Sequence, residues 1–517
     1  MSHVGNTLLI AKYAFVVLIL YYLLLSAYRI FAHPLKKYPG PWLARISDAY
    51  GGWYALRRRL HLQTYQDHLK YGPVIRQGPN KLVFNSATAL QDIYLNHSVS
   101  KAGNYNAGNV TYPNSNVFNV VRRSLHRMKR QRVGPIASER SMRTFEPQMA
   151  QQIDIFLQQL LTSCQNTLAA PINMAERCRW MALDIVARLS FGYDLNMQTD
   201  LMHRYLVRTM INGSWYINVS MQFPFTRRLK FGILLRVVAV ARGVSFLKTL
   251  TKMLKARLAQ DKHAKHDLYS FMIDAPIGPE GKKVTEKEIW TEAINFVAAG
   301  GDTTSTAMSS AFFYLARNPR CKEKLLQEIQ TTFESSADIH SGSKLSSCVY
   351  LRACIDEALR MSPPVPGTMW REQLLEDINT DKPFTVDGHI IPPGVHVGVN
   401  AYSIHHNEEY FPDPFVYKPE RWLPAEEGSE LTEAKRAAFV PFSIGARGCL
   451  GKPMAYQEAS LTIAKTIWFF DFELAAESIS GPDEFEVQDV FTTTHDGPYL
   501  HFHPREGRLG ELVDVEK

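Results

Sequence analysis

The stretch FVPFSIGARGCLGKPMAYQEASLTIAK, residues 439–465, decides the fold. A single cysteine, Cys449, lies here in a loop with three glycines, and a strongly helical run follows at once. Backbone N–H groups of the turn and the positive end of the helix dipole would stabilise a thiolate, which is the form of cysteine that binds a metal. The glycines Gly445, Gly448 and Gly451 permit tight turns and the close approach of something flat and large. The loop therefore predicts a metal-thiolate site, with a small buried apolar cysteine as the alternative.

Length and composition place this loop in a large globular chain. The 517 residues are 45% hydrophobic and 21% charged, which excludes disordered, collagen-like and disulfide-stapled classes. The six cysteines show no C-x-x-C and no paired spacing, so the sequence signals neither a zinc site nor a disulfide framework and favours a reducing compartment. A net charge of +8 suits nucleic acid and an anionic membrane equally, and the sign alone cannot choose between them.

The N-terminal segment 8–32 reads LLIAKYAFVVLILYYLLLSAYRIFA, which supplies the roughly 20 apolar residues that a bilayer requires. Basic residues follow it, among them Lys36 and Lys37, and this flank favours a cytosolic position for the remaining chain. A cleaved signal peptide is the alternative, but the apolar run is longer than its usual core. We therefore predict a membrane anchor over 1–32 and, from three prolines and a glycine in HPLKKYPGPW, a stiff hinge over 33–42.

Residues 43–517 are predicted to form one domain, because no repeat and no linker rich in Gly, Ser or Pro divides them. Apolar residues at i, i+3, i+4 and i+7 predict that helices dominate this part. The predicted helices are 149–163, 174–189, 247–264, 286–318, 321–333, 351–361 and 452–470. Short β-like runs are 74–76, 81–84, 384–386 and 396–400, with a turn at Asp387-Gly388. We expect a mainly α fold with a small β-sheet.

The spacing of the cysteine loop is Phe442-x-x-Gly445-x-Arg447-x-Cys449-x-Gly451. It resembles the haem-binding signature of the cytochrome P-450 family, the haem-thiolate monooxygenases, and the resemblance covers nearly the whole chain. It implies that Cys449 is the proximal thiolate ligand of the iron of haem b and that Arg447 pairs with a haem propionate. It also implies that Phe442 shields the sulfur, and that Gly445 and Gly451 belong to the same cofactor-binding loop. A thiolate ligand favours cleavage of the O–O bond.

Within the predicted helix 286–318, the segment AGGDTT at 299–304 contains poor helix formers, which favours a local opening of the backbone hydrogen bonds. Tight packing of a glycine-containing helix against a neighbour is the alternative. The segment resembles the oxygen-activation motif of the family. The resemblance implies that Thr303 holds a hydrogen bond to the oxygen that is activated and that Asp302 helps to relay protons, and an acid beside an alcohol suits proton delivery into an apolar pocket.

A third motif combines Glu357-x-x-Arg360 with the segment KPERW at 418–422. An acid and a base three residues apart share one helix face, and alone this pattern is more often a solvated ion pair. The family shows the same pair together with a second arginine, here Arg421. The resemblance therefore implies that Glu357, Arg360 and Arg421 form a structural network that holds the cysteine loop and perform no chemistry.

The two propionates of haem require cations. The run RRSLHRMKRQR at 122–132 has six arginines or lysines, and the alternative is a solvated face or a nucleic-acid patch. The family often has Trp-x-x-x-Arg here; with His126 in place of tryptophan, the match makes Arg130 a propionate candidate, and Arg371 is another. Positive charge around this run and near Lys452 would also suit docking of an acidic electron-donor protein.

The resemblance implies a monooxygenase that takes NADPH electrons from NADPH-cytochrome reductase, splits dioxygen and hydroxylates, epoxidises or desaturates a lipophilic substrate. The stretches KYPGPW, KYGPVIRQGPN and SPPVPGTMWRE are similar to membrane-bound fungal members of secondary metabolism. This implies a single-pass protein of the endoplasmic reticulum membrane with a cytosolic catalytic domain, in contact with lipid and not with nucleic acid. A haem-thiolate isomerase or dehydratase and a membrane haem-binding protein without turnover remain the alternatives, although Asp302 and Thr303 disfavour the first.

Overall fold

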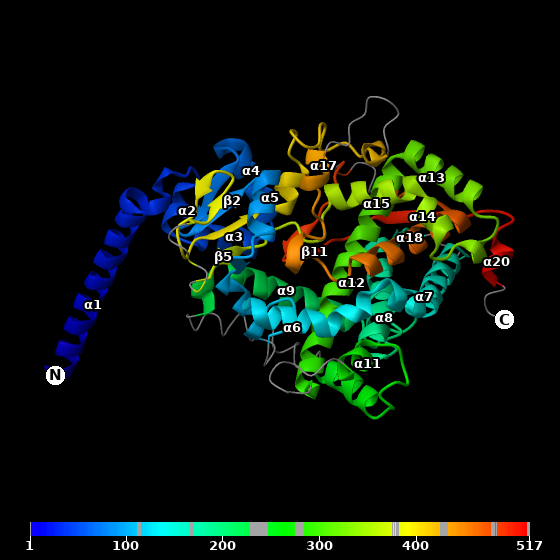
Figure 1. The fold of residues 1–517 in the computed structure, drawn as a ribbon, viewed down its shortest axis with the longest axis horizontal. Coiled ribbons are helices and arrows are strands. Elements are labelled where there is room, and N and C mark those ends of the chain that lie inside the picture. The colour runs from blue at the N-terminus through cyan, green and yellow to red at the C-terminus, as the bar shows by residue number, and fades with distance from the viewer. Residues whose placement is uncertain are drawn as a thin grey trace.

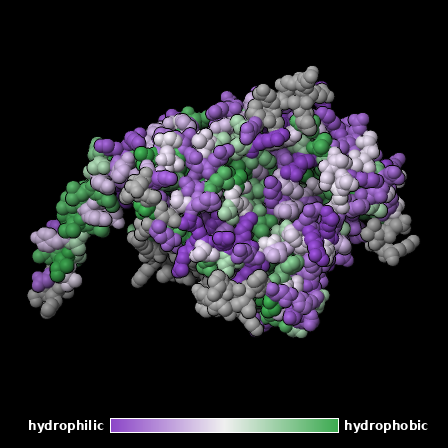
Figure 2. Space-filling model, in the orientation of Figure 1, coloured by the Kyte–Doolittle hydropathy of each residue, from purple (hydrophilic) through white to green (hydrophobic). Residues whose placement is uncertain are grey.

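The computed structural model describes residues 2–110, 115–165, 170–227, 247–274, 284–374, 376, 378, 382–423, 433–476, 481 and 483–513. Helix α1 (Ser2–Ala27) projects from the body at the N-terminus (Figure 1). With the π-helical turn η1 (Tyr28–Ala32) it contains the apolar span Asn6–Ala32, whose most apolar window has a mean hydropathy of 2.4 and no buried residue. Hydrophobic side chains cover much of its surface (Figure 2), so its length and composition fit a membrane crossing.

The proline-rich segment 33–42 is fixed against the body. Nδ1 of His33 accepts a hydrogen bond from the backbone N–H of Leu35 (3.1 Å), and Leu35 is completely buried. The backbone N–H of Arg76, in the first strand, donates to the carbonyl O of Pro39 (2.7 Å). The segment of the predicted hinge therefore has a defined position on the first strand of the body. The domain boundary between residues 42 and 43 stays a prediction.

A five-stranded sheet lies next to this entry point (Figure 1). Its order is β1 (Val74–Gly78), β2 (Lys81–Phe84), β8 (His396–Val399), β5 (Arg371–Gln373) and β3 (Val99–Lys101). Only the β2–β8 pair is parallel, with Leu82 opposite Val397; the other pairs in this sheet are antiparallel. Four short helices pack around the sheet: α2 (Trp42–Ile46), α3 (Ala49–Leu56), α4 (Leu60–Tyr71) and α5 (Ala87–Tyr94).

Helices make up most of the remaining body (Figure 1). They are α6 (Arg123–Val133), α7 (Glu139–Gln165), α8 (Met174–Phe191), α9 (Tyr205–Gln222), α11 (Leu268–Ile273), α12 (Glu286–Arg317), α13 (Pro319–Thr332), α14 (Ser343–Ser347), α15 (Val349–Met361), α16 (Ala401–His405), α17 (Glu433–Ala438), α18 (Lys452–Phe469) and α20 (Leu509–Val513). The predicted helix 247–264 is helical over 247–258. The prediction of a mainly α fold with a small sheet, preceded by one apolar helix, is confirmed.

Short strands complete the fold. A three-stranded antiparallel sheet has the order β4 (Ile172–Asn173), β12 (Tyr499–Pro504) and β9 (Phe470–Leu474), and two hairpins are β6 (Thr385–Val386) with β7 (His389–Ile390) and β10 (Gln488–Val490) with β11 (Thr492–Thr494). The predicted turn at Asp387-Gly388 joins β6 to β7, and both residues have positive φ.

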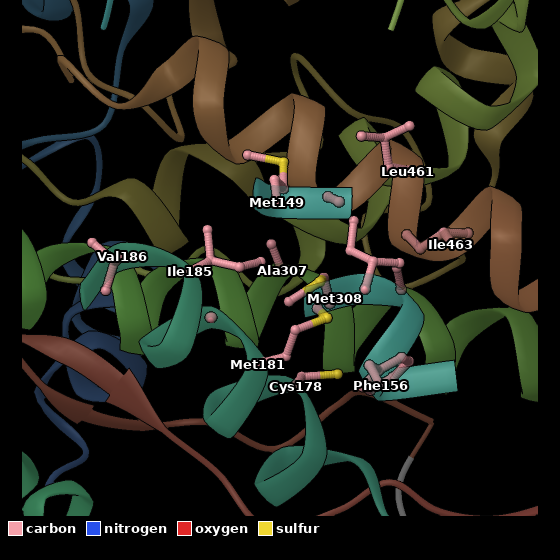
Figure 3. Packing of buried hydrophobic residues seen from close by; sticks show 14 of the residues in the cluster. Met149, Phe156, Cys178, Met181, Ile185, Val186, Ala307, Met308, Leu461 and Ile463 are labelled. Carbon is pink, nitrogen blue, oxygen red and sulfur yellow. The ribbon is translucent and has the colours of Figure 1, made fainter. Parts of the chain in front are cut away.

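The largest core cluster surrounds α12, which begins with a capping box between Thr285 and Glu288 and runs through the body. Figure 3 shows side chains of four helices meeting there, with Met149 from α7, Met181 from α8, Met308 from α12 and Leu461 from α18. Burial of these apolar side chains supplies the main stabilising term, at about 25 cal/mol per Å². The core thus fixes α12 relative to α8 and α18.

The glycines of the 299–304 segment bring α8 close to α12. A Cβ on Gly301 would lie 2.3 Å from Cδ2 of Leu183, and a Cβ on Gly300 would lie 2.9 Å from Cγ2 of Val186. Helix α12 is continuous across this segment, so the predicted local opening of its backbone hydrogen bonds is wrong. The alternative that the sequence allowed, a close contact between two helices, is what the glycines provide.

Candidate active site

Cys449 lies between the 3₁₀ turn η9 (Gly445–Arg447) and the start of α18. Its backbone N–H donates to the carbonyl O of Phe442 (2.8 Å), which closes the loop. Its Sγ accepts from the backbone N–H groups of Gly451 and Lys452, at the first turn of the helix. The loop therefore presents the sulfur to the positive end of an 18-residue helix.

The surroundings of the Cys449 sulfur suit a bound group. Cys449 is accessible to solvent. Protein atoms nevertheless surround its thiol closely, and the resulting desolvation raises the pKa of the thiol. The N–H groups of Gly451 and Lys452 and the charge of Arg130 act in the opposite direction. Burial outweighs these groups, so a positively charged group bound beside the sulfur would favour the thiolate.

The two glycines and the phenylalanine of the loop have different roles in the fold. Gly445 has a φ of +72°, and a Cβ on it would lie 2.3 Å from the carbonyl O of Tyr94, so the packing of the loop on α5 requires glycine there. A Cβ on Gly451 would lie 3.9 Å from Sγ of Cys449, an ordinary contact. The ring of Phe442 is half-buried and lies 5.0 Å from the ring of Tyr456.

Basic side chains from separate parts of the chain gather beside the cysteine loop. They are Lys101 in β3, His126 and Arg130 in α6, Arg371 in β5 and Arg447 in η9. Burial and, to a smaller extent, the charges of the other four lower the pKa of His126 to about 3. His126 is therefore neutral at neutral pH, and the four cations lie close enough to influence one another.

The four cations bond to backbone oxygens. Arg447 donates to the carbonyl O of Val120 (2.6 Å) and Val121 (2.9 Å), Arg130 to that of Gly448 (2.7 Å), Arg371 to that of Trp370 (3.1 Å) and Lys101 to that of Phe118. In the described part of the chain no carboxylate lies within ion-pair distance of any of them.

Buried positive charge of this size is unfavourable without anions. Burial and the neighbouring Arg371 lower the pKa of Arg447 to about 10, and burial lowers the pKa of Lys101 well below its ordinary value. Two carboxylates beside the sulfur of Cys449 would compensate this charge. Haem carries two propionates and an iron that takes a thiolate, so the residues present fit haem.

Thr303 and Asp302 have different surroundings on α12. Oγ1 of Thr303 donates to the carbonyl O of Ala299 (2.6 Å), and Ala299 is exposed although the helix runs inside the body. Asp302 is buried, and its Oδ1 lies 3.3 Å from Nε of Arg179 on α8. Burial raises the pKa of Asp302, and the guanidinium of Arg179 opposes this rise. Thr303 thus lies on a solvent-accessible face of α12, whereas Asp302 lies on the face that packs against α8.

The three residues of the predicted network are in contact. Arg360 forms a fork-like pair with Glu357, from Nε to Oε2 and from Nη2 to Oε1, both 2.9 Å, and both side chains are completely buried. Nε of Arg421 donates to Oε1 of Glu357 (3.1 Å). The arrangement suits a bidentate, charge-assisted pair that fixes geometry.

Two residues that the sequence reasoning missed connect this network to the cysteine loop. Nη1 of Arg360 donates to the carbonyl O of His405 (2.8 Å), and Nε2 of His405 accepts from the backbone N–H of Val440 (3.0 Å). Nε1 of Trp422 donates to Oε2 of Glu357 (3.0 Å), and its ring lies 4.4 Å from that of Phe439. The position of Trp422, directly after Arg421, was the available signal; His405 carried none.

The basic run 122–132 divides into inward and outward residues. Lys129 lies 3.0 Å from Oε1 of Glu292, a buried pair between α6 and α12, and Arg132 pairs with Glu288 on the same helix (3.5 Å). Arg122 and Arg127 are exposed, as is Lys452 at the start of α18. Part of the run therefore serves the fold, and the rest remains available at the surface.

Comparison with known proteins agrees with this site. The family model described as cytochrome P-450 matches residues 49–501. The cytochrome P-450 monooxygenase apf7 of Gibberella fujikuroi is 30% identical over 94% of this chain and 96% of its own length. The monooxygenase poxM of Penicillium oxalicum is 32% identical over 93% of both chains, and atnE of Emericella nidulans is 30% identical over 95% of this chain and 96% of its own length.

Proposed function

The chain belongs to the cytochrome P-450 family and is a monooxygenase, and from this premise we propose that it oxidises a lipophilic intermediate of fungal secondary metabolism. The proposed reaction uses dioxygen and NADPH electrons that NADPH-cytochrome reductase delivers. The observation that carries the proposal is the exposed Cys449 beside four cations, two of them buried and two half-buried, that have no carboxylate partner in the described residues.

The proposed cofactor is haem b, with Cys449 as the iron ligand. Arg130, Arg371 and Arg447 are the proposed propionate partners, and Lys101 adds a further positive charge beside them. When bound, the haem supplies the redox chemistry by which dioxygen is reduced and one of its atoms is transferred. The N–H groups of Gly451 and Lys452, at the start of α18, lower the pKa of the thiol against the larger effect of burial and so favour the thiolate that the iron would bind.

Thr303 and Asp302 are the proposed groups for proton supply. The hydroxyl of Thr303 donates to the carbonyl O of Ala299, and rotation about its χ1 bond releases this proton to a partner in the exposed space. Asp302 is paired with Arg179, so it is held in place without being fixed in hydrogen-bond geometry. Glu357, Arg360 and Arg421 keep their proposed structural role, because in the described residues they reach the loop through His405 and Trp422.

Three features support the proposed setting of the enzyme. Helix α1 fits a membrane crossing, and the basic residues that follow it favour a cytosolic body, for which we propose the endoplasmic reticulum membrane. The exposed cations Arg122, Arg127 and Lys452 would attract an acidic electron donor.

The proposed substrate is lipophilic and ring-bearing. The rings of Tyr105, Phe118 and Phe491 form a cluster with centroid distances of 5.4 to 6.5 Å, and Lys101 of the cation cluster lies over two of them. Aromatic side chains beside the proposed haem position favour apolar and ring-bearing partners.

Product analysis with labelled oxygen tests the proposal. Purified holoprotein, NADPH-cytochrome reductase and a panel of fungal terpenoid, polyketide and peptide intermediates are incubated under ¹⁸O₂. Incorporation of one labelled atom, dependent on NADPH, is the expected result for hydroxylation or epoxidation. Conversion of a substrate without dioxygen would instead identify an isomerase or dehydratase. Haem binding without NADPH consumption across the whole panel would contradict the proposal that the protein oxidises such an intermediate.

A further inference from the structure

Asp302 and Arg179 form a buried ion pair that leaves several polar atoms unpartnered. Their side chains are 1% and 6% exposed, and Nε of Arg179 lies 3.3 Å from Oδ1 of Asp302. In the described part of the chain, Nε and Nη2 of Arg179 and Oδ1 of Asp302 have no partner in hydrogen-bond geometry. Buried charged groups of this kind require further hydrogen bonds.

His495, which directly follows β11, contributes another unpartnered atom to the same region. Its Nδ1 lies 3.3 Å from Oγ1 of Thr306, one turn after Asp302 on α12, and its Nε2 has no hydrogen-bond partner among the described residues. Burial lowers the pKa of His495 well below its ordinary value, and the nearby charge of Arg179 lowers it further. The imidazole is therefore neutral.

The hydrogen bonds of Thr306 decide which nitrogen of His495 carries the proton. The hydroxyl of Thr306 lies 2.8 Å from the carbonyl O of Asp302, which only accepts, so the hydroxyl proton points there. Nδ1 of His495 must then donate to the oxygen of Thr306, as must the hydroxyl of Thr493 (2.8 Å). It follows that Nε2 of His495 is unprotonated and acts as an acceptor.

The unpartnered atoms are complementary through water. Arg179 offers N–H donors, whereas Oδ1 of Asp302 and Nε2 of His495 are acceptors, and the histidine has no direct hydrogen bond to either partner. One water molecule accepts one hydrogen bond and donates two in such a set, which is the usual number of partners of a buried water.

We propose that Arg179, Asp302 and His495 hold a buried water between them, and that His495 is a positioning residue for Asp302. The proposal rests on the proposed function of Asp302 in proton supply. The water fixes the orientation of the carboxylate, and it gives Oδ1 the hydrogen bond that the ion pair does not supply. Loss of the acceptor at Nε2 leaves the water with one partner fewer and lets the carboxylate turn.

A pair of variants separates this positioning role from a packing role. His495→Leu removes the acceptor, and His495→Gln retains one donor and one acceptor on a side chain of similar length. With full-length holoprotein and reductase, His495→Leu is expected to release several-fold more hydrogen peroxide per NADPH, and His495→Gln to remain near the wild type. Ser309→Ala, which removes another buried hydroxyl of α12, serves as the control and is expected to leave the peroxide yield unchanged.

Two readouts that do not depend on turnover complete the test. A crystal structure of the wild-type holoprotein is expected to show an ordered water within hydrogen-bond distance of Asp302 Oδ1 and His495 Nε2, and the His495→Leu structure to lack it. The reduced carbon monoxide spectrum of both variants should match the wild type, which separates failure of this proposal from failure of haem binding. An unchanged peroxide yield in folded, haem-loaded His495→Leu, or a wild-type structure without the water, would overturn it.

Discussion

The cysteine loop and the middle of α12 differ in how their buried polar groups are satisfied. Behind the loop, the carboxylate of Glu357 accepts from the side chains of Arg360, Arg421 and Trp422 and from the backbone N–H of Lys418. On α12, the buried pair of Asp302 and Arg179 keeps donors and an acceptor without a protein partner in the described residues. The first region is built to keep one geometry, and the second keeps capacity for water and protons.

The largest effect on stability should come from the region behind the cysteine loop, where the carboxylate of Glu357 has all its hydrogen-bond partners. Arg360→Ala leaves the completely buried carboxylate of Glu357 without its main partner, and breaking such a pair costs about 3–5 kcal/mol. Arg143→Ala breaks an exposed ion pair with Glu139 and should cost at most about 1 kcal/mol. Urea unfolding of both holoproteins, followed by circular dichroism, measures the two values. Equal losses would show that the network does not hold the loop.

Glu458 on α18, the helix that follows the cysteine loop, is a buried carboxyl group without the partners that Glu357 has, and it predicts a pH effect. It is buried, its Oε1 has no partner in the described residues, and burial raises its pKa to about 8. Between the unfolded value of 4.5 and about 8 the folded chain retains a proton that the unfolded chain has lost, so stability falls as pH rises. Glu458→Gln removes this titration.

The unfolding free energy of Glu458→Gln should therefore vary less between about pH 5 and about pH 8 than that of the wild type. Glu473→Gln, at an exposed position of β9, is the control and should keep the wild-type slope. A Glu458→Gln variant with the wild-type slope would show that this carboxyl ionises in the folded state as it does in the unfolded chain.

A glycine pair tests the close contact between α8 and α12. Gly301→Ala places a methyl group 2.3 Å from Cδ2 of Leu183, and overpacking of this kind costs about 1–3 kcal/mol. Gly213→Ala lies inside α9 with no atom within 4 Å of the new methyl group, so it should stabilise by about 0.5–1 kcal/mol. Thermal unfolding measures the change in stability of both variants, which should be a loss for Gly301→Ala and a gain for Gly213→Ala. A loss in Gly213→Ala as large as that in Gly301→Ala would contradict the packing argument.

The smallest effect on stability is expected from the proton-handling region. Thr303→Ala removes one hydroxyl that bonds within its own helix, and the unfolding free energy should change by about 0.5 kcal/mol or less. Hydrogen peroxide released per NADPH should nevertheless rise, because the variant lacks the hydroxyl that we propose for proton supply on the solvent-accessible face of α12. Peroxide yield and unfolding midpoint are measured on the same preparation. A destabilised variant with unchanged peroxide yield would reverse the assigned roles of the two regions.

Local patterns predicted most of the long helices but few of the short ones, because an apolar period of 3.6 residues can be recognised only over several turns, as in α12 and α15. Helix α9 was not predicted, since it contains Gly213 and several β-branched residues. The strands β9 and β12 were not predicted either, although apolar and polar residues alternate in the sequence FDFEL of β9. The glycines at 300 and 301 predict a helix opening from the local sequence, because the side chains that face them, Val186 and Leu183, lie far away in the sequence.

The candidate site divides in the same way. Cys449, Arg447 and Glu357 stand in motifs whose spacing is local, so the sequence identifies them. Lys101 and Arg179 are single basic residues in unremarkable surroundings, and only the packing of distant elements brings them to the cation cluster and to Asp302. Tertiary contacts of this kind leave no signal in one sequence.

The reduced carbon monoxide spectrum of the purified protein tests whether Cys449 is the ligand of the haem iron. We expect the absorption band typical of thiolate-ligated haem in the wild type, its retention in Cys164→Ser, and its loss in Cys449→Ser. Cys164 is a half-buried cysteine of α7 outside the site and serves as the matched control. A thiolate band that persists in Cys449→Ser would contradict the assignment of the iron ligand and of the site built around it.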